Sequence, residues 1–158
     1  GCCMRYDYRA AAPGVVEAMR GLEREIAQSG LERPLLHLVK IRASQLNGCA
    51  FCLAMHIREA REDGERQERI DLLPAWREAP FYNARERAAL AWTEAVTLLP
   101  QTGVPDDVYE QARAVFSPTE LAYLTLAIVA INGWNRLNVS FRIPPEVEDV
   151  SVERVYHA

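Results

Sequence analysis

The sequence predicts an all-α fold, and three observations support this prediction. Apolar residues recur at spacings of three and four along most of the 158-residue chain, as one face of a helix requires. Helix start and stop signals, such as Ser117-Pro118-Thr119-Glu120 and Gly30, bound these runs. The one segment with some strand-like alternation is VSVERVY, at residues 150–156.

The first two predicted helices lie between residues 13 and 47. After Pro13-Gly14, an apolar stripe predicts a helix that stops at Gly30; its members are Val15, Met19, Leu22 and Ile26. A second helix begins near Pro34, since a proline in the first turn lacks only an N–H group that has no helical partner there. This helix ends at Asn47-Gly48, a turn signal.

A third helix is predicted from about residue 49 to residue 63, with Gly64 in the position where a left-handed residue ends a helix. Its last two turns are strongly charged. We interpret them as a solvated face with helical ion pairs, formed by Arg58, Glu59, Arg61, Glu62 and Asp63.

The second half of the chain continues the helical pattern. A short polar helix is predicted at about 65–73, and Asn83 with Glu86 three residues later opens another that runs to about Leu99. A further helix covers about 106–116, and Ser117 caps the last one, which runs to about Leu137.

The last helix is apolar on nearly all sides, so neighbouring helices must surround it, either in the same chain or across a subunit interface. Asn132-Gly133 inside this helix is unusual, because glycine costs about 1 kcal/mol in a helix interior. We expect this glycine to permit close helix packing.

Chain length and composition predict one domain, 1–158, with a core at about 13–143 and a C-terminal extension at 144–158. Hydrophobic residues make up 49% and charged residues 25% of the chain, as in soluble globular proteins. The net charge of −4 provides no basic surface for nucleic acid. The longest apolar run, 121–131, is shorter than the roughly 20 residues of a membrane span. Because the N-terminus lacks the apolar region of a secretory signal, we expect a cytoplasmic protein.

The motif with the clearest chemistry is QLNGCAFCLAMH at residues 45–56, which contains Cys49, Cys52 and His56. Positions i, i+3 and i+7 fall on one face of a helix, so the two thiols and the imidazole lie together. Helix-start N–H groups favour a thiolate at Cys49, and His56 can accept a thiol proton near neutral pH. This is the minimum equipment for a two-electron reduction. Cys2 and Cys3 receive no role.

The short connection between the second and third helices predicts an antiparallel pair. Folding the chain at Asn47-Gly48 places residue 37 opposite residue 58, so we expect His37 to approach His56, and Ser44 and Gln45 to lie nearer the thiols.

Two other interpretations of the motif remain open. Free cysteines are often simply buried, so one of these interpretations is inert packing of the pair in a non-catalytic helical oligomer that binds a small molecule or a protein. Alternatively, Cys49, Cys52, His56 and His37 form a possible Cys₂His₂ metal site, although structural zinc sites usually hold CxxC in a tight turn. Our leading interpretation includes neither a metal nor a cofactor.

At these residues the chain resembles the alkylhydroperoxidase D-like (AhpD-like) proteins of the carboxymuconolactone decarboxylase superfamily. The matching segments are LVKIRASQLNGCAFCLAMH and, more loosely, ERAALAWTEAVT and LAIVAINGWNRL. The resemblance implies an all-α helical bundle that forms homo-oligomers, as dimers, trimers or hexamers. It also implies a thiol peroxidase or disulfide reductase that protects against oxidants. Superfamily members that act as decarboxylases lack the dithiol.

By the same resemblance, Cys52 is the thiolate that attacks a hydroperoxide, Cys49 is the resolving thiol, and His56 belongs to a proton relay. The reducing partner would be a dithiol, either dihydrolipoyl-type or thioredoxin-like. Two positions depart from the family. The characterised members carry a glutamate where this chain has His37, and often a second histidine at the position of Phe51. We therefore expect His37 to take the place of the glutamate in the relay.

Overall fold

The computed structural model describes residues 4–146, and within that range the chain forms helices and turns without a strand. This confirms the all-α prediction. The segment VSVERVY, most of the predicted extension, and Cys2 and Cys3 lie outside the described residues. The elements are α1 (Tyr8–Ala11), α2 (Pro13–Ala27), α3 (Arg33–Asn47), α4 (Ala50–Glu62), α5 (Gln67–Asp71), the 3₁₀ helix η1 (Leu73–Ala75), α6 (Ala84–Thr97), α7 (Leu99–Thr102), α8 (Asp106–Val115) and α9 (Pro118–Ser140).

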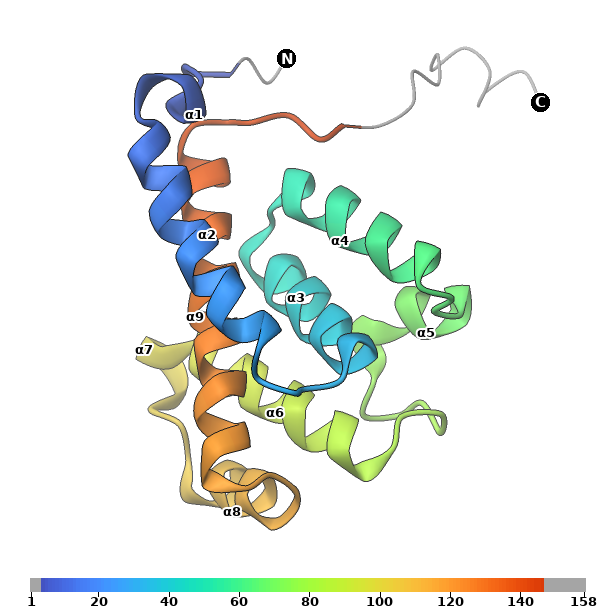
Figure 1. The fold of residues 1–158 in the computed structure, drawn as a ribbon. Coiled ribbons are helices and arrows are strands. Elements are labelled where there is room, and N and C mark those ends of the chain that lie inside the picture. The colour runs from blue at the N-terminus through green and yellow to red at the C-terminus, as the bar shows by residue number, and fades with distance from the viewer. Residues whose placement is uncertain (1–3, 147–158) are drawn as a thin grey trace, which may run out of the picture.

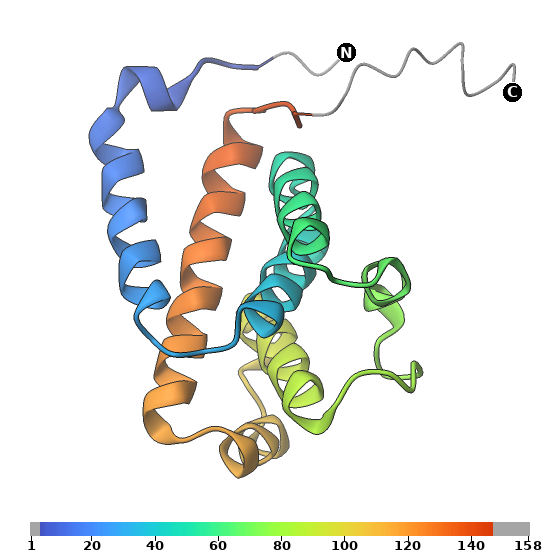
Figure 2. The same cartoon turned by 45° about the vertical axis from the view of Figure 1, so that its right-hand side comes forward.

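Helix α3 is the centre of the bundle. It packs against α4, α6 and α9, while α2 runs alongside α9 (Figures 1 and 2). The side chains of Leu38, Val39 and Ile41 on α3 are fully buried. Burying each of these side chains contributes roughly 1.5–3 kcal/mol. The core therefore fixes α3 on several sides, and α3 in turn fixes the start of α4.

The observed helices agree closely with the predicted ones. The differences lie mainly where proline interrupts the chain. Pro74 has no N–H group to continue an α-helix, so α5 ends at Asp71 and the chain turns through η1. Similarly, α6 ends at Thr97, and Pro100 lies within the first turn of the separate helix α7. Helix α9 extends three residues beyond Leu137, and α1 was not predicted.

Both predicted capping boxes are present. In α9 the Ser117 Oγ accepts from the Glu120 N–H at 3.1 Å, and the Glu120 carboxylate accepts from the Ser117 N–H at 2.9 Å. The prediction for Gly133 is also confirmed, since a Cβ atom there would lie 2.9 Å from the Met19 Cε on α2.

Among the described residues, no helix by itself has the length and apolar character of a membrane span. Helices α8 and α9 have the required length and apolar composition only when they are counted together, and the pair is bent by 119°.

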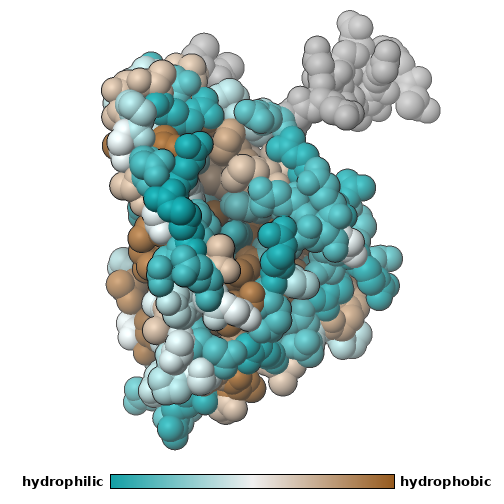
Figure 3. All heavy atoms as spheres, viewed as in Figure 1, coloured by the Kyte–Doolittle hydropathy of each residue, from teal (hydrophilic) through white to brown (hydrophobic). Residues whose placement is uncertain are grey.

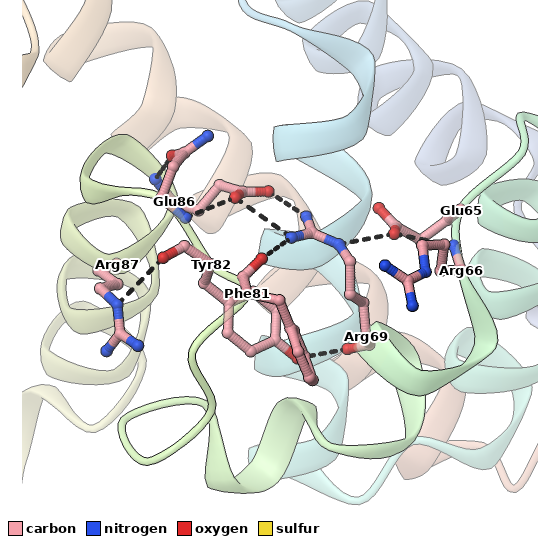
Figure 4. Close-up of polar contacts among 8 residues, drawn as sticks. Glu65, Arg66, Arg69, Phe81, Tyr82, Glu86 and Arg87 are labelled. Atoms are coloured by element: carbon pink, nitrogen blue, oxygen red, sulfur yellow. Dashed lines mark hydrogen bonds and ion pairs between the residues drawn. The ribbon is translucent and has the colours of Figure 1, made fainter.

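A buried ion-pair cluster holds the chain between α4 and α6 (Figure 4). Arg69 on α5 donates to Glu65 at 2.8 Å and also to Glu86 on α6 and to the Phe81 carbonyl. Its guanidinium lies 5.0 Å from the ring centre of Tyr82. The side chains of Arg69, Glu65 and Glu86 are at most 14% exposed. Each of these charges is therefore stabilised mainly by its partners in the cluster and not by water.

We expect Arg69→Met to lower the free energy of unfolding by about 3 kcal/mol, because it leaves two buried carboxylates without a cation. The matched control is Arg66→Met, since the Arg66 side chain is 67% exposed. Urea denaturation should show a change within about 0.5 kcal/mol for that control. Equal losses in the two variants would contradict the role given to the cluster.

Candidate active site

The connection between α3 and α4 positions the first cysteine. Gly48 adopts a left-handed conformation with φ of 65°, which ends α3. The Gly48 N–H donates to the Gln45 carbonyl at 3.3 Å, and the Cys49 N–H donates to the Ser44 carbonyl at 3.0 Å. This is a Schellman motif. Ser44 therefore lies beside the thiol pair, as the hairpin predicts.

Cys49 also begins the next helix. It is the N-cap of α4, and its Sγ accepts from the Cys52 N–H at 3.3 Å. Cys49 and Cys52 form a disulfide with their Cα atoms 5.3 Å apart. The predicted pair is therefore close enough to close a bond within one turn of chain. A sulfur in this position receives an N–H group that also stabilises a thiolate.

The two sulfurs have different surroundings, although both residues are buried. Cys49 lines a largely apolar cavity of about 190 Å³, together with Phe51 and residues at the end of α9 and beyond it, namely Asn138, Val139, Arg142, Ile143, Pro144 and Pro145. Cys52 is not among these lining residues. A molecule in this cavity meets the disulfide from the Cys49 side.

Cys52 instead faces a buried polar contact that sequence reasoning missed. The Asn138 Nδ2 on α9 lies 3.8 Å from the Cys52 Sγ and donates to the Trp134 carbonyl at 3.0 Å. The Tyr8 hydroxyl donates to the Asn138 Oδ1 at 3.1 Å. Burial raises the pKa of Tyr8, so its hydroxyl remains a donor at neutral pH. These contacts connect residues far apart in sequence, so no local pattern could show them.

His56 is buried one turn beyond Cys52 on α4, as the spacing predicts. Its Nδ1 makes a long hydrogen bond of 3.4 Å to the Glu59 Oε2, and its buried Nε2 has no hydrogen-bond partner among the residues that the structure describes. The hydrogen bond from His56 holds the pKa of the Glu59 carboxyl below its usual range against the opposing effect of burial, and Lys40 and His37 lower it further. Because an ionised carboxylate only accepts, we assign the proton to Nδ1, which leaves the Nε2 lone pair as a base.

His37 lies on α3 with a different partner. Its Nε2 bonds the Asp63 Oδ2 at 2.6 Å, and its Nδ1 is buried with no hydrogen-bond partner in the described part of the chain. The hydrogen bond from His37, and next that from Arg33, lower the pKa of Asp63. His37 thus faces the end of α4 rather than His56: among the described residues no hydrogen bond joins the two imidazoles, and each has its own carboxylate.

Two of the α4 charges have partners that the interpretation as a solvated face did not include, although both side chains remain in contact with solvent: the Glu59 side chain is 45% exposed and that of Asp63 34%. Glu59 and Asp63 bond the two histidines. The signal was present in the sequence, because positions 52, 56, 59 and 63 follow spacings of four, three and four, which keep them on one helix face. An interpretation based only on the charges of these residues missed this spacing.

The four donors of the possible Cys₂His₂ site are not assembled as a metal site. The sulfurs are bonded to each other, and within residues 4–146 no group of three or more His, Cys, Asp and Glu side chains is placed to hold a metal ion. The structure joins Cys49 and Cys52 as a disulfide, and His56 is buried one turn further along α4.

A second, more polar cavity of about 300 Å³ lies between α2, α3 and α4. Its charged and polar lining residues are Glu23, Arg33, His37, Lys40 and Glu59, and its apolar ones are Ile26, Ala27, Leu31 and Leu36. The face in Figure 3 is mostly hydrophilic, with apolar surface visible in the middle, between α2 and α4. Glu59 connects the buried ring of His56 to this cavity.

Comparison with known proteins identifies relatives along most of the chain. Residues 13–95 match the model of the carboxymuconolactone decarboxylase family. The uncharacterized protein YdfG of Bacillus subtilis is 41% identical over 136 residues, which cover 86% of this chain and 92% of YdfG. The uncharacterized protein YnjA of Escherichia coli is 30% identical over 125 residues, which cover 79% of this chain and 67% of YnjA.

Solved structures share the fold. A protein of unknown function from Agrobacterium tumefaciens, whose assignment as the antioxidant defence protein AhpD is provisional, has a TM-score of 0.89 and 47% identity. That match covers 92% of this chain and all of the other. The debrominase Bmp8 has a TM-score of 0.77 and 20% identity, over 89% of this chain and 74% of its own, and shows the fold alone.

The Tyr8–Asn138 contact gives a stability prediction. Asn138→Ala should cost the oxidised protein about 1–3 kcal/mol in urea denaturation, because it leaves the buried Tyr8 hydroxyl without an acceptor. With Tyr8→Phe already present, the same substitution should cost less, so the two changes should not be additive. Strict additivity would show that the hydrogen bond contributes nothing.

Proposed function

The chain belongs to the carboxymuconolactone decarboxylase family as an AhpD-like member, and from this premise we propose that it is a thiol-dependent peroxidase and disulfide oxidoreductase. Its substrates would be alkyl hydroperoxides, and its role antioxidant defence. The observation that carries the proposal is the Cys49–Cys52 disulfide at the start of α4, one turn from the buried imidazole of His56, whose Nε2 has no hydrogen-bond partner within residues 4–146.

The oxidative half of the cycle begins with the reduced pair. His56 Nε2 accepts the Cys52 thiol proton, and the thiolate attacks the terminal oxygen of the hydroperoxide. The S–O bond forms as the O–O bond breaks, and the alkoxide takes the proton from His56 and leaves as an alcohol. The Cys49 thiol then attacks the sulfur of the resulting sulfenic acid, which releases water and forms the disulfide. Two electrons have passed from the dithiol to the peroxide.

The reductive half begins from the oxidised form. A thiolate of an external dithiol attacks the Cys49 Sγ, because Cys49 lines the apolar cavity. The S–S bond breaks and Cys52 leaves as a thiolate beside Asn138 and His56. The second thiol of the reductant then displaces Cys49, which restores the reduced protein and oxidises the partner. A dihydrolipoyl-type group or a thioredoxin-like protein has the required pair of thiols.

We place this cycle in the cytoplasm, where reducing partners keep dithiols available. We also propose that the protein acts as a homo-oligomer, as the family resemblance implies. Neither proposal is needed for the chemistry of the pair, which lies within one chain.

The two cysteines should differ when replaced. Cys52→Ser should abolish peroxide consumption by the reduced protein, because it removes the attacking sulfur. Cys49→Ser should leave one round of attack and a sulfenic acid on Cys52, which a dimedone-type reagent traps for mass spectrometry. Unchanged peroxide consumption by Cys52→Ser would rule out the mechanism.

The accessible side of the disulfide gives a further prediction. Val139→Trp should fill the 190 Å³ cavity and slow reduction of the disulfide by dithiothreitol several-fold, since the thiol must reach Cys49. Val129→Trp is the matched control on the same helix, because Val129 is exposed and lies outside the cavity. Equal reduction rates in the two variants would show that thiols reach the disulfide by another route.

A further inference from the structure

By the family resemblance, His37 occupies the position of the relay glutamate, but its imidazole bonds a residue other than His56. The Nε2 of His37 bonds Asp63, and Asp63 also accepts from Arg33 at 2.7 Å. This imidazole is therefore tied to the end of α4. It supplies no carboxylate to His56.

A carboxylate nevertheless reaches His56, from α4 itself. Glu59 follows His56 by three residues, a spacing that places side chains on neighbouring positions of a helix surface. The Nδ1–Oε2 distance of 3.4 Å is long, yet it is the only hydrogen bond of the His56 ring within residues 4–146. The contact assigns the ring proton to Nδ1 and leaves the lone pair on Nε2.

Glu59 also provides a route for protons. The His56 side chain is 8% exposed, whereas the Glu59 side chain is 45% exposed and lines the polar cavity of about 300 Å³. That cavity is different from the apolar one lined by Cys49. Protons at the buried imidazole can therefore exchange with solvent without crossing the space through which a thiol reaches the disulfide.

We propose that Glu59 is the positioning residue of the redox site: it orients His56, balances the imidazolium that forms when Cys52 loses its proton and that lasts until the alkoxide takes this proton, and lets the Nδ1 proton exchange with the polar cavity. The proposal rests on the proposed function. No electron moves in this step; one proton moves from sulfur to Nε2, and the Nδ1 proton is shared with the Glu59 carboxylate.

Several ionisable groups surround Glu59. His56 lies on the same helix, Lys40 and His37 project from α3, and Glu23 of α2 lines the same cavity. Lys40 approaches Glu23 at 3.7 Å, so its charge is shared between the two carboxylates. Removing the Glu59 charge leaves Lys40 with Glu23, and leaves the His56 ring without a hydrogen-bonded carboxylate within residues 4–146.

The test compares Glu59→Gln with Glu62→Gln in the full chain. Glu62 lies on α4 and is exposed, so its replacement controls for the loss of one negative charge from the helix. Glu59→Gln should slow peroxide consumption by the reduced protein by about tenfold or more, as expected for weakened acid–base catalysis. The rising limb of its pH–rate profile should move to lower pH, because a protonated imidazole is less favourable without the carboxylate. Glu62→Gln should change neither.

A second readout separates this proposal from the peroxidase function. In a Cys49→Ser background, the rate of Cys52 alkylation by iodoacetamide is measured against pH, with and without Glu59→Gln. Glu59→Gln should shift this profile even if the wild type consumes no peroxide. Profiles that are identical with and without Glu59→Gln would overturn the role of Glu59, as would a shift produced by His37→Gln and not by Glu59→Gln.

Discussion

The site depends on Cys49, which belongs both to the motif that ends α3 and to the cap that begins α4. The Cys49 N–H completes the Schellman motif of α3, and its Sγ caps α4. Gly48 makes this possible, because its left-handed φ of 65° turns the chain within a single residue. Since α3 is held by the core on several sides, this junction places the first sulfur with little freedom. Cys52 then follows three residues later, with its Cα 5.3 Å from that of Cys49, a separation that a disulfide spans.

The sequence was sufficient for most of the fold because local signals and burial agree. Ser117 and Asn83 start helices by capping boxes that need only four residues each, and Gly48 and Gly64 end helices where φ is positive. The errors arose where proline changed the geometry. Pro74 and Pro100 begin short helices of their own, and periodicity does not detect elements of three or four residues.

The candidate site was only partly predictable, for a related reason. Cys49, Cys52 and His56 lie on one helix, so their spacing determines their relation. The contact of Asn138 with Cys52 joins positions 86 residues apart, and only the packing of α4 against α9 creates it. The sequence predicts His37 opposite residue 58, but it bonds Asp63, five residues further along α4, because a simple count back from the turn ignores the angle at which α3 and α4 pack. Glu59 was visible in the spacing but was assigned to solvent on the basis of its charge.

The central claim is that Cys49 and Cys52 pass two electrons to a hydroperoxide and end as a disulfide. The most direct measurement mixes the fully reduced chain with one equivalent of an organic hydroperoxide, counts the remaining thiols and maps the linked peptides by mass spectrometry. The account predicts the loss of two thiols, a mass lower by about 2 Da, one equivalent of alcohol, and a bond between Cys49 and Cys52. Retention of all four thiols, or a bond formed by Cys2 or Cys3 instead, would contradict it.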